Sequence, residues 1–200
     1  GRGWVTLLLL GASIAVAVRS QLGASWPGYA DLLLTNFPPS AGLPELRAGQ
    51  IWRLFTPITI HFGFMHLGFN LSMWWTWAQR IEGHKGAAFF GTFVLAAAAT
   101  TNLAEHAWGL LTAPYALRAV GGLSGVLYAL FGYGWRKQQI DPHAAMVVDP
   151  GTVQWMLGWL VLCMTGLLGS VANVAHVSGL LIGVAWAHVD QAWFQWQKRR

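Results

Sequence analysis

Long apolar runs separated by short polar segments dominate this chain, and they predict six helices that cross a membrane. The predicted helices cover residues 3–22, 57–77, 87–104, 121–136, 152–168 and 172–190. A hydrocarbon core about 30 Å thick requires roughly 20 residues of helix, and most of the runs approach that length. Residues 151–189 carry no charge and as one helix would be about 60 Å long, so they must fold back. Gly166, Gly169 and Ser170 mark the expected turn.

The stretch between the first two runs, residues 23–56, is too broken for a membrane helix. Its helix-breaking and aromatic residues include Pro27, Pro38, Pro39, Pro44, Trp26, Tyr29, Phe37 and Trp52. Aromatic side chains favour the boundary between hydrocarbon and water. We therefore expect a long structured loop that rests in this interface.

Composition supports a membrane protein, because 55% of the residues are hydrophobic and only 10% are charged. Soluble domains usually contain about 25% charged residues. We expect an all-α membrane protein with a single domain over residues 1–200. The net charge of +5 could suggest nucleic acid, but the basic residues sit at the ends of apolar runs. This placement predicts the lipid bilayer as a partner and excludes nucleic acid. Because the chain starts at Gly1 rather than Met, we expect that an upstream region has been removed.

The basic residues are divided unevenly between the two sides of the predicted bundle. With six crossings both termini lie on one side, which carries eight of the twelve: Arg2, Arg80, Lys85, Arg136, Lys137, Lys198, Arg199 and Arg200. The other side carries four: Arg19, Arg47, Arg53 and Arg118. Cytoplasmic segments are enriched in Lys and Arg, so both termini are predicted to be cytoplasmic. Ser124, His66 and His176 then lie at similar depth in the outer half of the bilayer.

Two polar residues stand at the starts of apolar helices. Ser124 lies in the first turn of the fourth predicted helix, within the run GGLSG that starts at Gly121. Backbone N–H groups in a first turn lack partners within the helix, so the hydroxyl lies beside free donors. His176 begins the sixth predicted helix in apolar surroundings. Polar residues inside a membrane are costly, so we interpret both as functional.

Small residues allow the fourth and sixth helices to approach each other closely. His176, Gly179 and Gly183 share one face of the sixth helix, and small residues also flank Ser124 on the fourth. Small faces permit close packing in membranes. We expect Ser124 and His176 to lie within hydrogen-bond reach, with Tyr128 one turn further on and packed against the imidazole.

Peptide hydrolysis by a serine needs a general base and donors for the oxyanion. His176 is the candidate base, since an imidazole performs this task best near neutral pH. Asp190 is the only acid on that helix, and fourteen residues place it about 21 Å away. That distance excludes a triad, so a Ser–His dyad is the consistent interpretation.

The oxyanion donors are expected from two places. The Ser124 N–H, with Leu123 nearby, supplies backbone donors at a helix start. His66 and Asn70 are four apart on one helix face and supply side-chain donors if their helix faces the fourth. No metal or cofactor is predicted, since His61 and His66 are five apart and no Cys or carboxylate joins them.

Each candidate also has a structural interpretation. Ser124 alone is a common helix cap, and His176 alone could be an interhelical hydrogen-bond partner. His66 and Asn70 alone could be polar contacts between helices. Four polar residues at matched depth on three helices are nevertheless hard to assign to packing. The remaining histidines are interpreted as interfacial residues: His61, His106 and His188.

Together these motifs resemble the rhomboid intramembrane serine proteases, and in particular their bacterial six-helix members. Order and spacing agree from Trp52 to Asp190. The matching residues are Trp52-Arg53, His66-x-x-x-Asn70, Glu82, Gly122-Leu123-Ser124-Gly125 with Tyr128, and Ala175-His176-x-x-Gly179-x-x-x-Gly183.

The resemblance implies a rhomboid bundle of six transmembrane helices with a long interfacial loop between helices 1 and 2. It implies that Ser124 is the nucleophile and His176 the base of an endopeptidase in the bacterial inner membrane. Its substrates would be transmembrane proteins, cut near the outer membrane face. The implied oxyanion and substrate-binding residues are His66, Asn70, Gly122 and Leu123, and the supporting residues are Tyr128, Gly179 and Gly183.

The sequence also allows two other functions. The first is a catalytically silent member of the same fold that binds transmembrane clients as a scaffold. Such relatives usually lack the serine or the histidine, and both are present here. The second is a small transporter or proton relay that uses His66 and His176. A broken helix pair or an inverted repeat would favour it, and the sequence contains neither.

Overall fold

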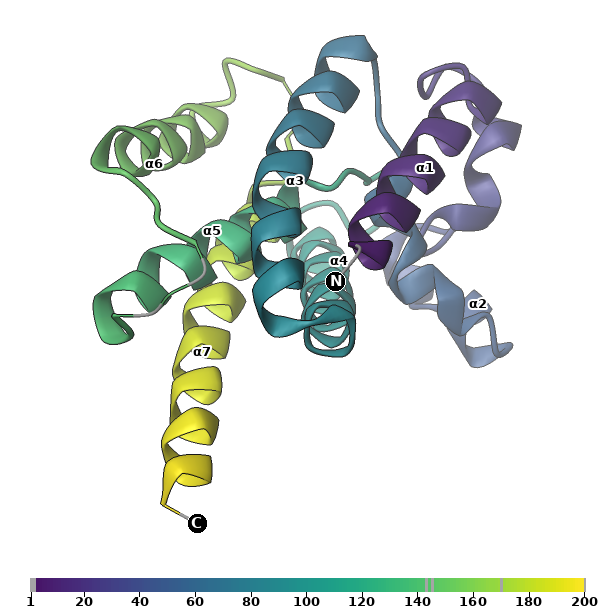
Figure 1. Cartoon of the computed structure of the whole chain (residues 1–200). Coiled ribbons are helices and arrows are strands. Elements are labelled where there is room, and N and C mark those ends of the chain that lie inside the picture. Colours follow the sequence, from purple (N-terminus) through teal and green to yellow (C-terminus); the bar gives the residue numbers. More distant parts are fainter. Residues whose placement is uncertain (1–2, 143, 145, 170, 200) are drawn as a thin grey trace.

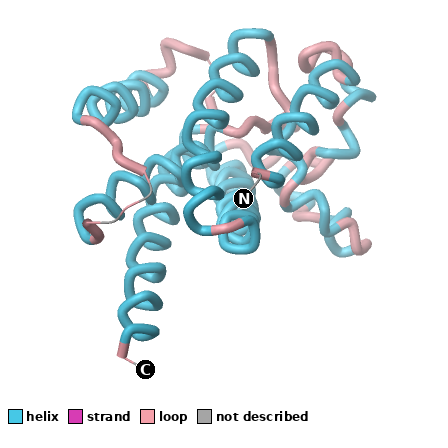
Figure 2. Tube along the Cα trace, in the orientation of Figure 1, coloured by secondary structure: helices cyan, strands magenta, loops and turns pink. Residues whose placement is uncertain are grey.

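The computed structural model describes residues 3–142, 144, 146–169 and 171–199, so Arg2, Ser170 and Arg200 of the predictions above lie outside it. The described residues form helices and loops without a β-strand (Figure 2), which confirms the all-α fold class. Their α-helices are α1 (Trp4–Arg19), α2 (Pro44–Arg47), α3 (Phe64–Lys85), α4 (Ala87–Thr112), α5 (Ser124–Ile140), α6 (Pro150–Met164) and α7 (Asn173–Lys198). Short 3₁₀ helices cover Trp26–Gly28, Ala30–Leu32, Pro39–Ala41, Ile51–Leu54 and Thr56–Thr59.

The second long helix, α3, differs from its prediction at both ends. It begins at Phe64 and not near residue 57, because the preceding Gly63 has a φ of 95° that no helix accommodates. It also continues through the polar residues 79–85, which were expected to form a loop. Glu82 within that stretch is buried, with its carboxylate bonded to the first turn of α1. Since the charge has partners, the helix ends only at Gly86, where φ is 85°.

The third long helix, α4, is longer than predicted. It runs to Thr112, so the loop expected over residues 105–120 begins eight residues later. Glu105 suggested a loop, yet its side chain is 2% exposed and bonded to two other segments. The helices α5 and α7 extend to Ile140 and Lys198, beyond the predicted ends at residues 136 and 190. Hydropathy alone underestimates all of these helices, because polar residues at their ends remain helical.

By length and apolar composition, α4 qualifies as a membrane-crossing helix, and no other helix in the described part of the chain does. α1 is similarly apolar but has only 16 residues. Helix α5 has 17 residues and ends in Arg136, Lys137 and two glutamines. The number of crossings therefore stays a prediction.

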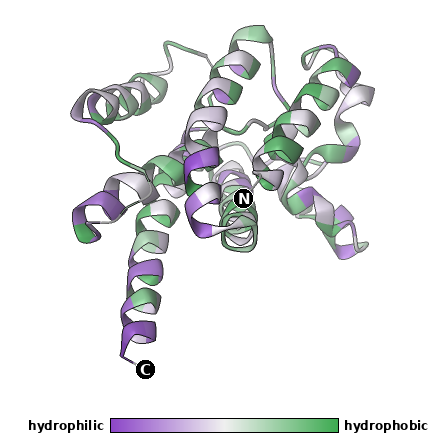
Figure 3. Ribbon diagram, viewed as in Figure 1, coloured by the Kyte–Doolittle hydropathy of each residue, from purple (hydrophilic) through white to green (hydrophobic). Residues whose placement is uncertain are grey.

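Helix α5 forms the centre of the molecule. Every residue from Gly125 to Gly134 is buried, so this part of the helix has no polar face. It packs along α7, where a Cβ on Gly179 or Gly183 would overlap the carbonyl oxygen of Gly125 or Ala129. The close approach predicted from small residues is present. Beyond α5, the C-terminal part of α7 projects away from the other helices (Figure 1), and hydrophilic residues gather on it (Figure 3).

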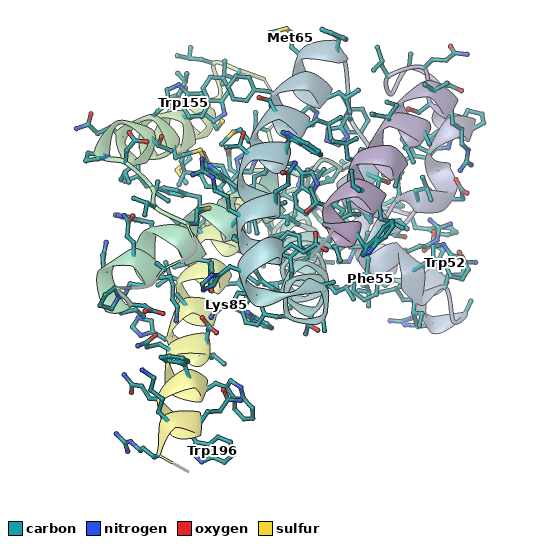
Figure 4. The ribbon with its side chains drawn as sticks, viewed as in Figure 1. Trp52, Phe55, Met65, Lys85, Trp155 and Trp196 are labelled. Carbon is teal, nitrogen blue, oxygen red and sulfur yellow. The ribbon has the colours of Figure 1, made fainter. Side chains whose placement is uncertain are left out.

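The segment between α1 and α3 is a structured loop, as expected. Arg53 is 5% exposed and donates to the carbonyl oxygens of Ala30 and Leu33, at 2.9 and 2.7 Å. Burial alone would raise the pKa of the Glu45 carboxyl, but hydrogen bonds from the Asn36 N–H and the Thr35 hydroxyl lower it overall. Trp52 stays half exposed at the loop surface (Figure 4). These bonds fix the loop that underlies the site.

Candidate active site

The structure brings Ser124 and His176 into direct contact. Ser124 is the first residue of α5, and His176 lies in the first turn of α7. The distance between Ser124 Oγ and His176 Nε2 is 2.8 Å, a hydrogen bond. The Tyr128 ring lies against the imidazole with its centroid 4.8 Å away, in the place that the sequence predicted. The imidazole is 4% exposed, so packing fixes its orientation.

The turn before Ser124 is held by its backbone N–H groups. Gly122 has a φ of 121°, which only glycine adopts without strain, and its N–H donates to the Pro57 carbonyl at 3.0 Å. The Leu123 N–H donates to His61 Nε2 at 3.4 Å. Among the described residues, the Ser124 N–H has no acceptor. It is therefore a backbone donor at this helix start that is left for a ligand.

His66 lies against this turn from α3. Its Nδ1 accepts from the Phe62 N–H at 3.2 Å, which places the proton of a neutral imidazole on Nε2. A Cβ added to Gly122 would lie 2.8 Å from that Nε2, so the Nε2 edge faces the turn before Ser124. Any side chain larger than hydrogen at residue 122 would displace this edge.

Asn70 lies one turn further along α3 and is 5% exposed. Its amide nitrogen donates to the His66 carbonyl of its own helix at 2.6 Å. Its Oδ1 is buried without a hydrogen-bond partner in the part of the chain that the structure describes. The amide nitrogen carries a second hydrogen, so one donor is left for a ligand.

His61 has a role that the sequence did not predict. It was interpreted as an interfacial residue, and the structure shows it completely buried behind the serine turn. Its Nδ1 lies 3.1 Å from the Thr59 carbonyl and must donate to it, so Nε2 is free to accept from the Leu123 N–H. Its ring packs edge-on against His66, with centroids 5.1 Å apart. A lone imidazole outside a helix has no periodicity, and its position within an apolar stretch was the only signal in the sequence.

Asp190 lies on α7 far from His176, as their separation of fourteen residues in the sequence predicted. Its carboxylate binds Lys85 and Lys137 at 2.7 and 2.8 Å and accepts from the Tyr133 hydroxyl. Lys85 reaches it from the end of α3 (Figure 4). His176 Nδ1 is buried and has no partner among the described residues, so no carboxylate orients the imidazole. Within the described residues, Ser124 and His176 therefore contact each other without a carboxylate on the imidazole.

Ser124, His176, His66 and Asn70 all line one cavity of about 770 Å³. Aromatic side chains of α3 and α6 close one side of it, since Phe69 stacks on Trp155 with centroids 5.2 Å apart. A volume of this size accommodates a peptide segment around the serine. Within the described residues, no group of three or more His, Cys, Asp or Glu is placed to hold a metal ion.

Comparison with known proteins agrees with this geometry. Residues 48–192, more than half of the chain, match the family model of the Rhomboid domain. The chain belongs to the rhomboid family. It is 31% identical over 197 residues to the Rhomboid protease GlpG of Enterobacter sp. (strain 638), covering 94% of this chain and 63% of that protein. It is 35% identical over 142 residues to the Rhomboid protease GlpG of Salmonella paratyphi A, covering 70% of this chain and 49% of that protein. The chain thus spans about half to somewhat less than two thirds of the length of these relatives, 49% and 63% in the two comparisons.

Proposed function

We propose that this chain is an intramembrane serine endopeptidase that works through a Ser124–His176 dyad. The observation that carries the proposal is the 2.8 Å contact between Ser124 Oγ and His176 Nε2 inside a cavity. The relatives named as rhomboid proteases support it. A serine hydroxyl is a weak nucleophile until an adjacent base removes its proton, and this contact supplies that base.

The reaction proceeds through an acyl-enzyme. His176 Nε2 takes the hydroxyl proton while Ser124 Oγ forms a bond to the carbonyl carbon of the substrate. The carbon–nitrogen bond then breaks, and the leaving amine receives the proton from Nε2. Nε2 then takes a proton from water, whose oxygen attacks the ester carbon. The bond from that carbon to Ser124 Oγ breaks, Oγ receives the proton from Nε2, and the second product leaves as a carboxylic acid.

The oxyanion of the tetrahedral intermediate needs preorganised donors. We assign this role to the Ser124 N–H, to His66 Nε2–H and to the second amide hydrogen of Asn70. The bonds of Gly122 and Leu123 to Pro57 and His61 support a different role for these two residues. They hold the turn in the shape that presents the Ser124 N–H. Tyr128 fixes the plane of the imidazole.

The substrates are proposed to be transmembrane proteins cut near the outer face of a bacterial inner membrane. Six crossings of the chain with both termini in the cytoplasm would place Ser124 in the outer half of the bilayer. The excess of Lys and Arg on the side of the termini supports this orientation. The apolar wall of the cavity suits a segment that leaves a lipid environment.

The test is cleavage of a reporter in proteoliposomes that contain the chain. The reporter carries one transmembrane helix with small residues near its outer end. We expect Ser124→Ala to lower the cleavage rate about a thousand-fold or more, because no other nucleophile lies at this position. Ser72→Ala, at an exposed serine of α3, is the matched control and should cleave at the parental rate. Equal cleavage by Ser124→Ala and the parent would refute the dyad. A folded parent without cleavage that still binds the reporter would favour the scaffold function.

A further inference from the structure

Glu105 connects three segments of the chain at the edge of the candidate site. It lies on α4, and its side chain is 2% exposed. One carboxylate oxygen accepts from Arg118 Nη2 at 3.0 Å, and the other accepts from the Ala175 N–H at 3.1 Å. A carboxylate is rarely buried without partners, and here both oxygens have one.

The bond to Ala175 fixes the start of α7. Ala175 is the third residue of that helix, so its N–H has no acceptor within the helix. The residue before the helix, Ala172, has no side chain that could cap it, and Glu105 supplies the cap from another helix. The negative charge also suits the positive end of the helix dipole. His176 follows Ala175 directly, so this contact lies one residue from the candidate base.

The bond to Arg118 fixes the segment that leads to the serine. Arg118 lies in the connection between α4 and α5, six residues before Ser124. It lines the same cavity as Ser124 and His176. The following turn is held separately by Pro57 and His61. Glu105 therefore joins the segment before the serine to the helix of the histidine through one side chain.

We infer that Glu105 is a positioning residue that sets the distance between Ser124 and His176. This inference rests on the proposed function. Without the carboxylate, the first turn of α7 loses its cap and the segment around Arg118 loses its anchor. A shift of about 1 Å in a catalytic group can lower a rate by about a hundred-fold. The loss should appear in kcat and not in KM, since Glu105 does not line the cavity that holds the substrate.

Glu82 provides a matched control for this inference. It is 3% exposed and also caps a helix from another helix, with bonds of 2.9 Å to the Val5 and Thr6 N–H groups of α1. On α3 it is sixteen residues from His66, about 24 Å along the axis. Removing Glu82 therefore also removes a buried helix cap and lowers the stability of the fold, but it leaves the surroundings of Ser124 and His176 unchanged.

The experiment compares Glu105→Ala, Glu105→Gln and Glu82→Ala in proteoliposomes with the transmembrane reporter. Rates are divided by the folded fraction, measured for each variant by resistance to protease. We expect Glu105→Ala to lower kcat at least about ten-fold with KM unchanged. Glu105→Gln should recover most of kcat, because its amide oxygen still accepts from the Ala175 N–H. Glu82→Ala should keep the parental kcat.

The outcomes separate the inference from the function on which it rests. A parental kcat for folded Glu105→Ala, or an equal loss in Glu82→Ala, would overturn the positioning role. The role would also be overturned if Glu105→Gln loses as much kcat as Glu105→Ala. The glutamine still accepts from the Ala175 N–H, so this bond would then not be what maintains kcat. If Glu105→Ala does not fold, Arg118→Ala decides the question, because it removes the second bond of Glu105, and a parental kcat in folded Arg118→Ala rejects the inference. The proposed function would be rejected instead if neither the parent nor Ser124→Ala cleaves the reporter.

Discussion

At the scale of single residues, His61 shows how a buried imidazole can support a site without touching the substrate. It bridges the Thr59 carbonyl and the Leu123 N–H and has no exposed surface. We expect His61→Leu to lower the free energy of unfolding by about 1–3 kcal/mol, because two buried backbone groups lose their partners. Unfolding in mild detergent micelles measures this change.

His61→Gln should lose less stability than His61→Leu, since an amide both donates and accepts. His84→Leu, at an exposed histidine of α3, is the control and should not change the unfolding free energy. Equal unfolding free energies for His61→Leu and the parent would contradict the bridging role.

The residues at the helix starts were more predictable than those behind them. Ser124 and His176 were paired from sequence, because each begins an apolar helix and small residues recur on both. The same pattern placed Tyr128 against the imidazole, where the structure has it. Sequence could not show that Gly122 and Leu123 use their N–H groups for Pro57 and His61. Those bonds depend on chain segments that meet only in three dimensions.

At the scale of elements, the packing of α5 against α7 sets the distance between Ser124 and His176. A Cβ on Gly183 would overlap the Ala129 carbonyl oxygen, so Gly183→Ala must push the two helices apart. We expect this variant to lose about 1–3 kcal/mol of stability. Its folded fraction should cleave the reporter at least about ten-fold more slowly, because the distance from Ser124 to His176 increases.

Gly158→Ala on α6 is the matched control, since a Cβ there meets nothing within 4 Å. This variant should be unchanged or stabilised by about 0.5–1 kcal/mol, as alanine is the better helix former. Cleavage by Gly183→Ala at the parental rate would show that the close approach is dispensable. Both changes are measured by unfolding and by reporter cleavage in the same preparations.

The ends of the elements were the least predictable part of the fold. Helices α3 and α4 continue past the predicted ends because Glu82 and Glu105 are buried with partners from other helices. Hydropathy counts such carboxylates as loop residues. The start of α5 was likewise expected at residue 121, but the positive φ of Gly122 delays it to Ser124. Each difference arises from a tertiary contact or a backbone angle that a hydrophobic pattern does not encode.

At the scale of the whole molecule, the two ends of the bundle have different chemistry. One end holds the cavity with Ser124 and His176, and the other holds the carboxylate of Asp190 between two lysines. Apolar runs separated by polar segments were sufficient to predict an all-α chain of this order. The family followed from the spacing of a few motifs, and the match over residues 48–192 confirms it. The predicted transmembrane arrangement adds one consequence, that the cavity opens toward the outer side.

The central claim is that Ser124 is a nucleophile activated by His176, and covalent labelling tests it most directly. The chain in proteoliposomes is treated with a fluorophosphonate, and the modified residue is located by mass spectrometry of its peptides. We expect a single adduct on Ser124, no adduct in Ser124→Ala, and labelling at least about a hundred-fold slower in His176→Ala. An adduct on another serine, or parental labelling by folded His176→Ala, would contradict the account.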